Sequence, residues 1–419
     1  MNTQIIILAA GKGKRMKSML PKVLHQVSGN PMLFYPLNLA RSIGAYRIIT
    51  VIGYGGHTVQ RIFRTKTNFA WQKKQAGTAD AVRKCEKHLR GFQGNVVILC
   101  GDAPLLRRLT LKKLLAEHRE SSADATVLSA RVEEPSGYGR IVRNTDGNFL
   151  AIREEKDASF EEREIHEVNT GAYVFKWSVL KKFLNNIKTN NKQGERYLTD
   201  APVLMRKAGY EINIASCETA DEAMGINSRA ELARANQIMN QRIIAEHSEN
   251  GVTFIDPSNT YIEDNVKIGK DTTIHPFTYI EKEVRIGKNC SIGPFCKIRS
   301  GSVIGNGAVV GSFVEVVRSK IGEKTNVKHL TYLGDATVGR YVNIGAGTIT
   351  ANFDGRRKQK TIIGDRSFVG CDTVFVAPVR MGDHAKTGAG TVIPRGRDVK
   401  SGTTVVGVPS RPLPKVKKR

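Results

Sequence analysis

YIEDNVKIGKDTTIHPFTYIEKEVRIGKNCSIGPFCKIRSGSVIGNGAVVGSFVEVV, residues 261–317, carries a branched apolar residue at every sixth position. The unbroken series consists of Ile262, Ile268, Ile274, Ile280, Ile286, Ile292, Ile298, Ile304, Val310 and Val316. It resumes at Ile321, Val327, Leu333, Ile344, Ile363, Val369, Phe375 and Met381. A six-residue period is typical of a parallel β-helix, in which each repeat supplies one short strand and one bend. Three repeats make a triangular coil, and each branched side chain packs on its counterpart in the next coil, roughly 4.8 Å away.

Two features modify this repeat. Cys290 and Cys296 each lie four residues after a leading isoleucine, in a slot for small inward side chains, so packing explains them better than metal binding. Residues 351–362, ANFDGRRKQKTI, break the period altogether. Insertions in solenoid proteins tend to project from one face and to carry function, so we expect part of a functional site here.

The first half of the chain follows a different pattern. Short apolar runs such as IIILAA, RIITVIG and NVVILCGD alternate with helix-like stretches such as PMLFYPLNLARSI and TLKKLLAEH. This alternation predicts a largely parallel sheet that binds its ligand at the carboxyl ends of the strands. Apolar residues then recur at helical spacing between a Ser228-x-x-Glu231 capping box and Gly251. We therefore expect a domain at 1–226, a linker helix at 227–250 and the β-helix at 251–419.

The chain has a net charge of +26, from 65 Lys plus Arg against 39 Asp plus Glu, a balance often met in proteins that bind nucleic acid. The basic residues are spread over the whole length without a recognisable nucleic-acid module, so we do not expect nucleic acid as the main partner. The basic segment PKVKKR at 414–419 fits a solvated end or a phosphate contact equally well. No apolar run reaches about 18 residues, and the start MNTQIIILAAG does not have the features of a signal peptide. The six cysteines form no CxxC pair, so we expect a cytoplasmic protein with free thiols, no zinc and no membrane insertion.

A phosphate-binding pattern follows the first predicted strand, in LAAGKGKRMKSMLPKVLH, residues 8–25. Gly11 and Gly13 let the backbone approach a phosphate, and Arg15 and Lys22 add positive charge. A GxG turn alone is common in structural roles. A strand, GxG, Arg and Pro-Lys in this order favour a site for a nucleoside triphosphate.

The order of motifs along the chain resembles that of one enzyme family. LAAGxGxRM…PKxL resembles the signature of sugar-nucleotide pyrophosphorylases, and it is followed by QAGTADA, GDAPLL, SGYGRIVR, EEKDA, EVNTGAY and GERYLTD. KHLTYLGD and NIGAGTITANFDG resemble an acetyltransferase signature. Over essentially its entire length the chain is similar to the bifunctional N-acetylglucosamine-1-phosphate uridylyltransferase/glucosamine-1-phosphate acetyltransferase family.

The resemblance implies both a fold and a function. The fold is an α/β nucleotidyltransferase with a Rossmann-like, mostly parallel sheet, then a linker helix and a left-handed parallel β-helix of hexapeptide repeats that forms a homotrimer. The function is synthesis of UDP-N-acetylglucosamine, a precursor of peptidoglycan and lipopolysaccharide in cell wall biogenesis. Acetyl-CoA would acetylate glucosamine 1-phosphate, and UTP would then transfer its uridylyl group to N-acetylglucosamine 1-phosphate with release of pyrophosphate.

Residues for uridylyl transfer follow from the same resemblance. UTP would contact Leu8, Ala9, Ala10, Gly11, Gly13, Lys22, Gln72, Gln75, Gly77 and Thr78. The sugar phosphate would contact Gly139, Glu154, Asn169 and Asn227. Asp102 and Asn227 would share Mg²⁺, which prefers oxygen ligands, and Asp102 comes just after an apolar strand. Arg15 and Lys22 would be catalytic, because they would stabilise the pyrophosphate that departs during in-line attack on the α-phosphorus.

The β-helix would hold the second site. His329 would be the general base of acetyl transfer, since an imidazole titrates near neutral pH. Glucosamine 1-phosphate would contact Arg299, Tyr332, Asn343 and Lys358. Acetyl-CoA and the oxyanion would contact Ala346, Asn352, Phe353, Cys371 and Ala389, with Asn352 orienting His329 and the N–H of Ala346 at the oxyanion. Acetyl-CoA would lie in a groove between the β-helices of neighbouring subunits.

The sequence departs from the family pattern at five positions of these sites. Lys14 stands where Thr is usual, and Asp80 stands where His is usual, beside the predicted base contacts. Val317 replaces a phosphate-binding Lys, Cys371 replaces a Ser, and Gly407 replaces an Arg near the cofactor.

The departures in the β-helix predict a lower affinity for glucosamine 1-phosphate with the chemistry retained, unless Arg318 or Arg411 compensates. They also leave open a monofunctional nucleotidylyltransferase whose β-helix only assembles subunits, although the joint retention of His329, Asn352 and Lys358 speaks against it. A regulatory scaffold is a third reading, because subunits of a eukaryotic translation initiation factor pair the same two folds. A non-catalytic scaffold is disfavoured because these predicted site residues are all present: Gly11, Arg15, Lys22 and Asp102.

Overall fold

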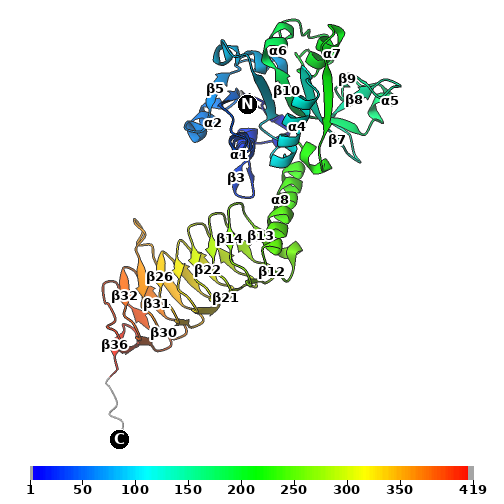
Figure 1. Ribbon diagram of the computed structural model, residues 1–419. Coiled ribbons are helices and arrows are strands. Elements are labelled where there is room, and N and C mark those ends of the chain that lie inside the picture. Colours follow the sequence, from blue (N-terminus) through cyan, green and yellow to red (C-terminus); the bar gives the residue numbers. More distant parts are fainter. Residues whose placement is uncertain (1–2, 414–419) are drawn as a thin grey trace. The chain divides into compact units, whose positions relative to one another are not determined.

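The computed structural model describes residues 3–413, so that the basic PKVKKR segment lies outside the described residues. The chain divides into two compact units, Met1–Ile238 and Met239–Arg419, and the division falls inside helix α8, Arg229–Glu249. Figure 1 shows the first unit as a sheet surrounded by helices and the second as a stack of short strands. Between residues 3 and 413, no helix is long and apolar enough to cross a lipid bilayer.

The first unit is built on a sheet with the strand order β11-β7-β10-β6-β1-β4-β5. These strands are β1 (Thr3–Ala9), β4 (Arg47–Ile52), β5 (Asn68–Trp71), β6 (Asn95–Cys100), β7 (Ala125–Arg131), β10 (Glu167–Lys176) and β11 (Ile212–Ser216). β1 runs parallel to β4 and β6, whereas β10 runs antiparallel to β6 and β7. The hairpin of β8 (Gly139–Arg143) and β9 (Phe149–Arg153) joins this sheet through β10, whereas β2 (Gln26–Val27) and β3 (Asn30–Pro31) pair in a separate hairpin. The predicted α/β fold with a mostly parallel sheet is confirmed.

Helices cover both faces of this sheet because its central strands are apolar on both sides. Along β1, Ile5 and Ile7 belong to one buried cluster and Ile6 to another. The first cluster includes side chains of α1 (Phe34–Ser42), α2 (Gly56–Phe63) and α4 (Arg108–Glu120). The second includes side chains of α3 (Thr78–Arg83), α6 (Trp177–Phe183) and α7 (Asp200–Lys207). Shorter turns of this unit are α5 (Phe160–Arg163) and the 3₁₀ segments Lys14–Met16, Lys22–Leu24, Glu86–Leu89 and Ala220–Ala223, and a further 3₁₀ segment, Pro257–Asn259, lies in the second unit.

Helix α8 begins and ends at the predicted signals. Ser228 Oγ accepts from the backbone N–H of Glu231 at 3.2 Å, and the carboxylate of Glu231 accepts from the N–H of Ser228 at 2.6 Å. This reciprocal pair satisfies donors of the first turn that have no partner within the helix. After the helix, Gly251 has a φ of 87°, which an L side chain would disfavour.

The second unit is a parallel β-helix whose strands form three faces. Face 1 contains β12 (Thr253–Phe254), β15 (Thr273–Ile274), β18 (Ser291–Ile292), β21 (Val309–Ser312), β24 (Asn326–His329), β27 (Asn343–Ile344), β30 (Phe368–Val369), β33 (Lys386–Thr387), β35 (Thr404–Val406) and β36 (Arg411–Pro412). Face 2 contains β13 (Tyr261–Ile262), β16 (Tyr279–Ile280), β19 (Lys297–Ile298), β22 (Glu315–Val317), β25 (Tyr332–Gly334), β28 (Ile349–Ala351), β31 (Val374–Val376) and β34 (Val392–Ile393). Face 3 contains β14 (Lys267–Ile268), β17 (Arg285–Ile286), β20 (Val303–Ile304), β23 (Lys320–Ile321), β26 (Ala336–Val338), β29 (Thr361–Ile363) and β32 (Val379–Met381).

The six-residue series forms one continuous core inside these coils. Ile280 pairs in register with Ile298, and Ile298 with Val316, so each branched side chain packs on its counterpart in the next coil. Cys290 and Cys296 are each 3% exposed and belong to this core, as the packing interpretation predicted.

Two columns of bend residues lie between the faces. Corner A follows each face 1 strand, two residues after its inward side chain, and contains Ser312, His329, Ala346, Cys371, Ala389 and Gly407. Corner B follows each face 2 strand in the same way and contains Ser300, Arg318, Asp335 and Asn352. Because the strands stack in parallel register, residues of one corner come from successive coils and lie above one another.

Candidate functional site

The loop after β1 closes against Lys22. Gly13 has a φ of 59°, and a Cβ at this position would come within 2.7 Å of the Cβ of Lys22. A glycine therefore permits both the left-handed backbone and the close approach of the loop. Arg15 follows on the 3₁₀ turn and is exposed.

Two pockets adjoin at the carboxyl ends of β1 and β6. The β1 pocket is lined by most of the residues predicted for UTP: Leu8, Ala9, Ala10, Gly11, Lys22, Gln72, Gln75, Gly77 and Thr78. The β10 pocket is lined by Arg15 and by the residues predicted for the sugar phosphate: Gly139, Glu154, Asn169 and Asn227. Both pockets include Leu8, Thr78, Cys100 and Asp102. Residues far apart in the sequence thus line one continuous site where a parallel sheet usually binds its ligand.

The amide of Gln72 is held in one orientation at the β1 pocket. Its Nε2 donates to the carbonyl oxygen of Gly77 at 2.9 Å and to the carboxylate of Asp80 at 3.0 Å. Arg83 Nη2 lies 2.9 Å and Lys84 Nζ lies 3.3 Å from the same carboxylate. Burial acts to raise the pKa of Asp80, but hydrogen bonds from Gln72, Arg83 and Lys84 hold it below its ordinary value. Asp80 therefore stays ionised, and the Oε1 of Gln72 is the amide atom left for a ligand.

An irregularity in β10 shapes the second pocket. The pairing of β10 with β7 shifts register between Asn169 and Tyr173. Asn169 Nδ2 donates to the Tyr173 hydroxyl at 2.7 Å, and its Oδ1 accepts from the N–H of Gly171 at 3.1 Å. Glu154 accepts a hydrogen bond from Thr199 Oγ1 at 3.0 Å, yet burial raises the pKa of its carboxyl. Asn169 and Glu154 are thus fixed in the wall of the pocket, where they can meet the hydroxyl groups of a sugar.

A lysine links the two predicted metal ligands. Lys22 Nζ donates to Asp102 Oδ2 and, at 2.9 Å, to Asn227 Oδ1. Two oxygen atoms from distant parts of the chain therefore converge on one positive group. These oxygens suit Mg²⁺, which often binds one or two protein oxygens and completes its shell with water and substrate phosphates. Across residues 3–413 there is no cluster of three or more His, Cys, Asp and Glu that would form a metal cage.

Corner A carries the predicted base and cofactor contacts. His329, Cys371 and Ala389 are exposed there, and the side chains beyond His329 in this column are small. The N–H of Ala346 has no hydrogen-bond partner within residues 3–413, so it is available to an oxyanion. Arg411 lies on β36 opposite Val406, beside the glycine of this column.

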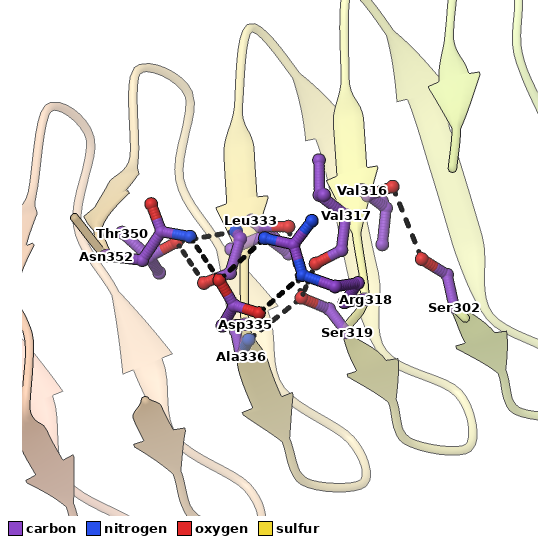
Figure 2. Close-up of polar contacts among 11 residues, drawn as sticks. Ser302, Val316, Val317, Arg318, Ser319, Leu333, Asp335, Ala336, Thr350 and Asn352 are labelled. Carbon is purple, nitrogen blue, oxygen red and sulfur yellow. Dashed lines mark hydrogen bonds and ion pairs between the residues drawn. The ribbon is translucent and has the colours of Figure 1, made fainter. Parts of the chain in front are cut away.

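Asn352 lies at the other corner and does not bond to His329. Figure 2 shows Asn352 and Arg318 reaching Asp335 from opposite sides. Arg318 donates through Nε and Nη2 to the two carboxylate oxygens at 2.7 and 2.8 Å, and Asn352 Nδ2 donates to Oδ2. Val317 is 2% exposed, so no group at this position replaces the lysine of the family pattern. Within residues 3–413, no hydrogen bond joins Asn352 to the imidazole.

The predicted glucosamine phosphate contacts are spread over two faces and the insertion. Asn343 lies on face 1, and Arg299 and Tyr332 lie on or beside face 2. Arg299 Nη1 donates to Glu315 at 3.2 Å. A Cβ on Gly334 would come within 2.6 Å of both the Tyr332 hydroxyl and Asn352 Nδ2, so glycine lets these side chains approach. Lys358 is exposed in the insertion. Its backbone forms an isolated antiparallel β-bridge with Phe353, whose side chain is 61% exposed.

Several pocket residues are missing from the predicted set. Thr199 fixes Glu154, and Lys156 and Gln193 line the β1 pocket, where Lys156 Nζ donates to Gln193 at 3.0 Å. The motifs EEKDA and GERYLTD contain or border these residues. Their signal was present, but only the fold shows which of their side chains reach the pocket. Asp335 gave no signal beyond its place in KHLTYLGD.

Comparisons with known proteins cover both units. The nucleotidyl transferase family model matches residues 4–213, and those of the bacterial transferase hexapeptide (six repeats) and the hexapeptide repeat of succinyl-transferase match residues 283–318 and 360–395. The bifunctional protein GlmU of Caldanaerobacter subterraneus subsp. tengcongensis is 42% identical over 434 residues, which cover 96% of this chain and 94% of that protein. The proteins of the same name from Staphylococcus epidermidis (42% identical, 94% of each chain) and Acetivibrio thermocellus (40%, 93% and 91%) are similar to the same extent.

The identity extends over both the nucleotidyltransferase domain and the left-handed β-helix. It therefore excludes the hypothesis that the chain is a regulatory scaffold that shares only its fold with these enzymes. UTP and acetyl-CoA are the substrates of this family. The chain belongs to the GlmU family of bifunctional enzymes, which combine uridylyltransferase and acetyltransferase activities in the synthesis of UDP-N-acetylglucosamine.

Proposed function

We propose that residues 1–226 perform uridylyl transfer at the joined β1 and β10 pockets, and that residues 251–419, after the linker helix 227–250, perform acetyl transfer. The observation that carries the first assignment is the shared wall of the two pockets at Leu8, Thr78, Cys100 and Asp102. UTP in the β1 pocket and N-acetylglucosamine 1-phosphate in the β10 pocket would bring the attacking phosphate oxygen next to the α-phosphorus. In such a reaction the protein mainly positions its reactants and neutralises charge.

The positive charges of Arg15, in the β10 pocket, and Lys22, in the β1 pocket, would stabilise the departing pyrophosphate. Mg²⁺ would be held by Asp102 and Asn227, whose oxygens already converge on a cation. When bound, Mg²⁺ supplies charge neutralisation at the phosphates. The uracil base would be held in the β1 pocket by Gln72, Gln75, Gly77 and Thr78. The sugar phosphate would be held in the β10 pocket by Gly139, Glu154, Asn169 and Asn227.

We propose that acetyl transfer takes place at the β-helix, at a site that a neighbouring chain completes. His329 would take the proton from the amine, and the N–H of Ala346 would stabilise the oxyanion. Arg299, Tyr332, Asn343 and Lys358 would hold glucosamine 1-phosphate, and Phe353, Cys371 and Ala389 would line the acetyl-CoA groove. Corner A and corner B lie on opposite sides of face 2, which supports a homotrimer in which a corner of one chain meets a neighbouring chain.

The cellular role follows from the product. UDP-N-acetylglucosamine would feed peptidoglycan and lipopolysaccharide synthesis and hence cell shape. All six cysteines are free thiols, which supports a reducing compartment such as the cytoplasm.

Two assays test the proposal on the full-length protein. The first supplies UTP, Mg²⁺ and N-acetylglucosamine 1-phosphate and measures pyrophosphate. The second supplies acetyl-CoA and glucosamine 1-phosphate and measures free thiol. Both products are expected from the same preparation, and failure of either assay under conditions where the other succeeds would reject that half of the proposal.

A further inference from the structure

Arg318 is the positive residue nearest in sequence to the missing lysine at position 317, so its partners decide whether it can bind a phosphate. One edge of its guanidinium is occupied, because Nε and Nη2 donate to the two carboxylate oxygens of Asp335. Two parallel hydrogen bonds of this kind match the planar geometry of both groups. The side chain of Arg318 is 38% exposed, whereas that of Asp335 is 16% exposed.

The backbone that carries the Asp335 side chain is fixed by two hydrogen bonds to the preceding coil. The N–H of Asp335 donates to the carbonyl oxygen of Val317 at 3.0 Å, and the following N–H, of Ala336, donates to Ser319 Oγ at 2.8 Å. Figure 2 shows the bond between Ala336 and Ser319, and it places the amide of Asn352 on the side of Asp335 away from Arg318. Corner B therefore forms a column of cation, carboxylate and amide over three coils.

This column ends where the insertion begins. Asn352 is 6% exposed, and its carbonyl oxygen accepts from the N–H of Gln359 at 2.7 Å, which closes the base of the inserted loop. Lys358 lies on that loop. Hydrogen bonds from Arg318 are the main cause of the lowered pKa of Asp335, and the charge of Lys358 contributes to it. Asp335 is thus bonded to one cation, Arg318, and is also influenced by the charge of a second, Lys358.

We propose that Arg318 is a positioning residue for acetyl transfer: it neutralises and orients Asp335, so that Asn352 anchors the inserted loop and Lys358 stays available to the phosphate of the substrate. Arg318 is then not a substitute phosphate ligand for the lysine absent at position 317. The inference rests on the proposed acetyl transfer at the β-helix.

The test uses three variants of the full-length protein: Arg318→Met, Asp335→Asn and the double variant. The KM for glucosamine 1-phosphate is measured by thiol release at saturating acetyl-CoA. In Arg318→Met, the uncompensated carboxylate repels the phosphate and attracts Lys358, so we expect KM to rise about tenfold. Asn at position 335 still accepts a hydrogen bond from Asn352 but carries no charge. In the double variant we therefore expect KM to return to within about threefold of the wild type.

A direct phosphate ligand would behave differently, because removing Asp335 does not replace a lost contact with substrate. A double variant as impaired as Arg318→Met overturns the proposal. Arg318→Lys keeps the charge with a single bond, so its KM is expected to lie between the wild-type and Arg318→Met values. The matched control is Arg340→Met, which breaks the exposed pair of Arg340 with Asp365 elsewhere in the same coils and is expected to leave KM unchanged.

A second readout does not depend on acetyl transfer. Arg356 and Arg357 are exposed in the inserted loop, so trypsin can report how firmly the loop is held. Arg318→Met is expected to speed cleavage there at least threefold, and the double variant and Arg340→Met are expected to match the wild type. If the wild type releases no thiol, the proposed acetyl transfer fails and the trypsin comparison still decides the role of Arg318. Equal cleavage in all four proteins overturns that role.

Discussion

The pockets of the first unit and the corners of the β-helix bring functional residues together in different ways. In the first unit, strands of one sheet end at the same edge, so that Lys22, Asp102 and Asn227 meet within a single chain. In the β-helix, each residue is fixed to a coil and a corner, and His329 and Asn352 lie at different corners. A sheet edge concentrates side chains, whereas a solenoid spreads them along its surface, which is why we propose a neighbouring chain for the second site and not for the first.

The sharpest contrast between the two sites comes from His329→Ala. We expect acetyl transfer to fall on the order of 10²- to 10⁴-fold, because the general base is lost, while pyrophosphate release stays unchanged. Thiol and pyrophosphate assays on the same preparation check this. Loss of both activities would mean that the two sites are not separate.

Asp102→Ala reverses the contrast. We expect uridylyl transfer to fall on the order of 10²- to 10³-fold, because the carboxylate that meets Lys22 and Asn227 is removed from the shared wall of the pockets. Thiol release is the internal control and is expected to stay at the wild-type rate. An unchanged rate of pyrophosphate release would remove Asp102 from the proposed metal site.

Mixed assemblies test whether a second chain completes the β-helix site. Chains carrying His329→Ala are co-expressed with chains carrying Asn352→Ala, each with its own tag, and the mixed oligomers are purified. We expect thiol release about tenfold above that of either variant alone, because some sites then contain an intact copy of both residues. The matched mixture of Lys22→Met and Asp102→Ala should recover no uridylyl transfer, since these residues meet within one chain. Recovery in neither mixture would assign both sites to single chains.

The smallest expected effect concerns the orientation of Gln72. Asp80→Ala removes one of the two acceptors for its amide, and we expect the KM for UTP to rise about five- to tenfold with little change in kcat. The folded pKa of Asp80 is lowered, so its contribution is complete above the ordinary pKa and is lost only as the pH falls through the lower folded value. The ratio of mutant to wild-type KM should therefore be constant between about pH 6 and 8. A ratio that changes over this range would argue against an ionised Asp80.

Much of the candidate site was readable from motifs, because the family signatures mark which residues follow each strand. Leu8, Gln72, Glu154 and Asn169 were named from sequence and line the two pockets. The motifs include Thr199 and Asp335 but did not reveal their partners, because both side chains bond to predicted residues from other parts of the chain. Such partners are set by the folded geometry and leave no periodic signal.

The sequence by itself determined the architecture, since a six-residue apolar period is compatible with a β-helix and alternating apolar runs with a layered α/β sheet. It also determined the helix between them, through the Ser228 and Glu231 capping box and Gly251. Only the tertiary structure decided that Arg318 binds Asp335, that Asp80 binds Gln72 and that His329 and Asn352 are separated. The physical reason is that periodicity reports which side chains are buried, whereas a polar side chain takes its partner from whatever the fold places within about 3 Å of it.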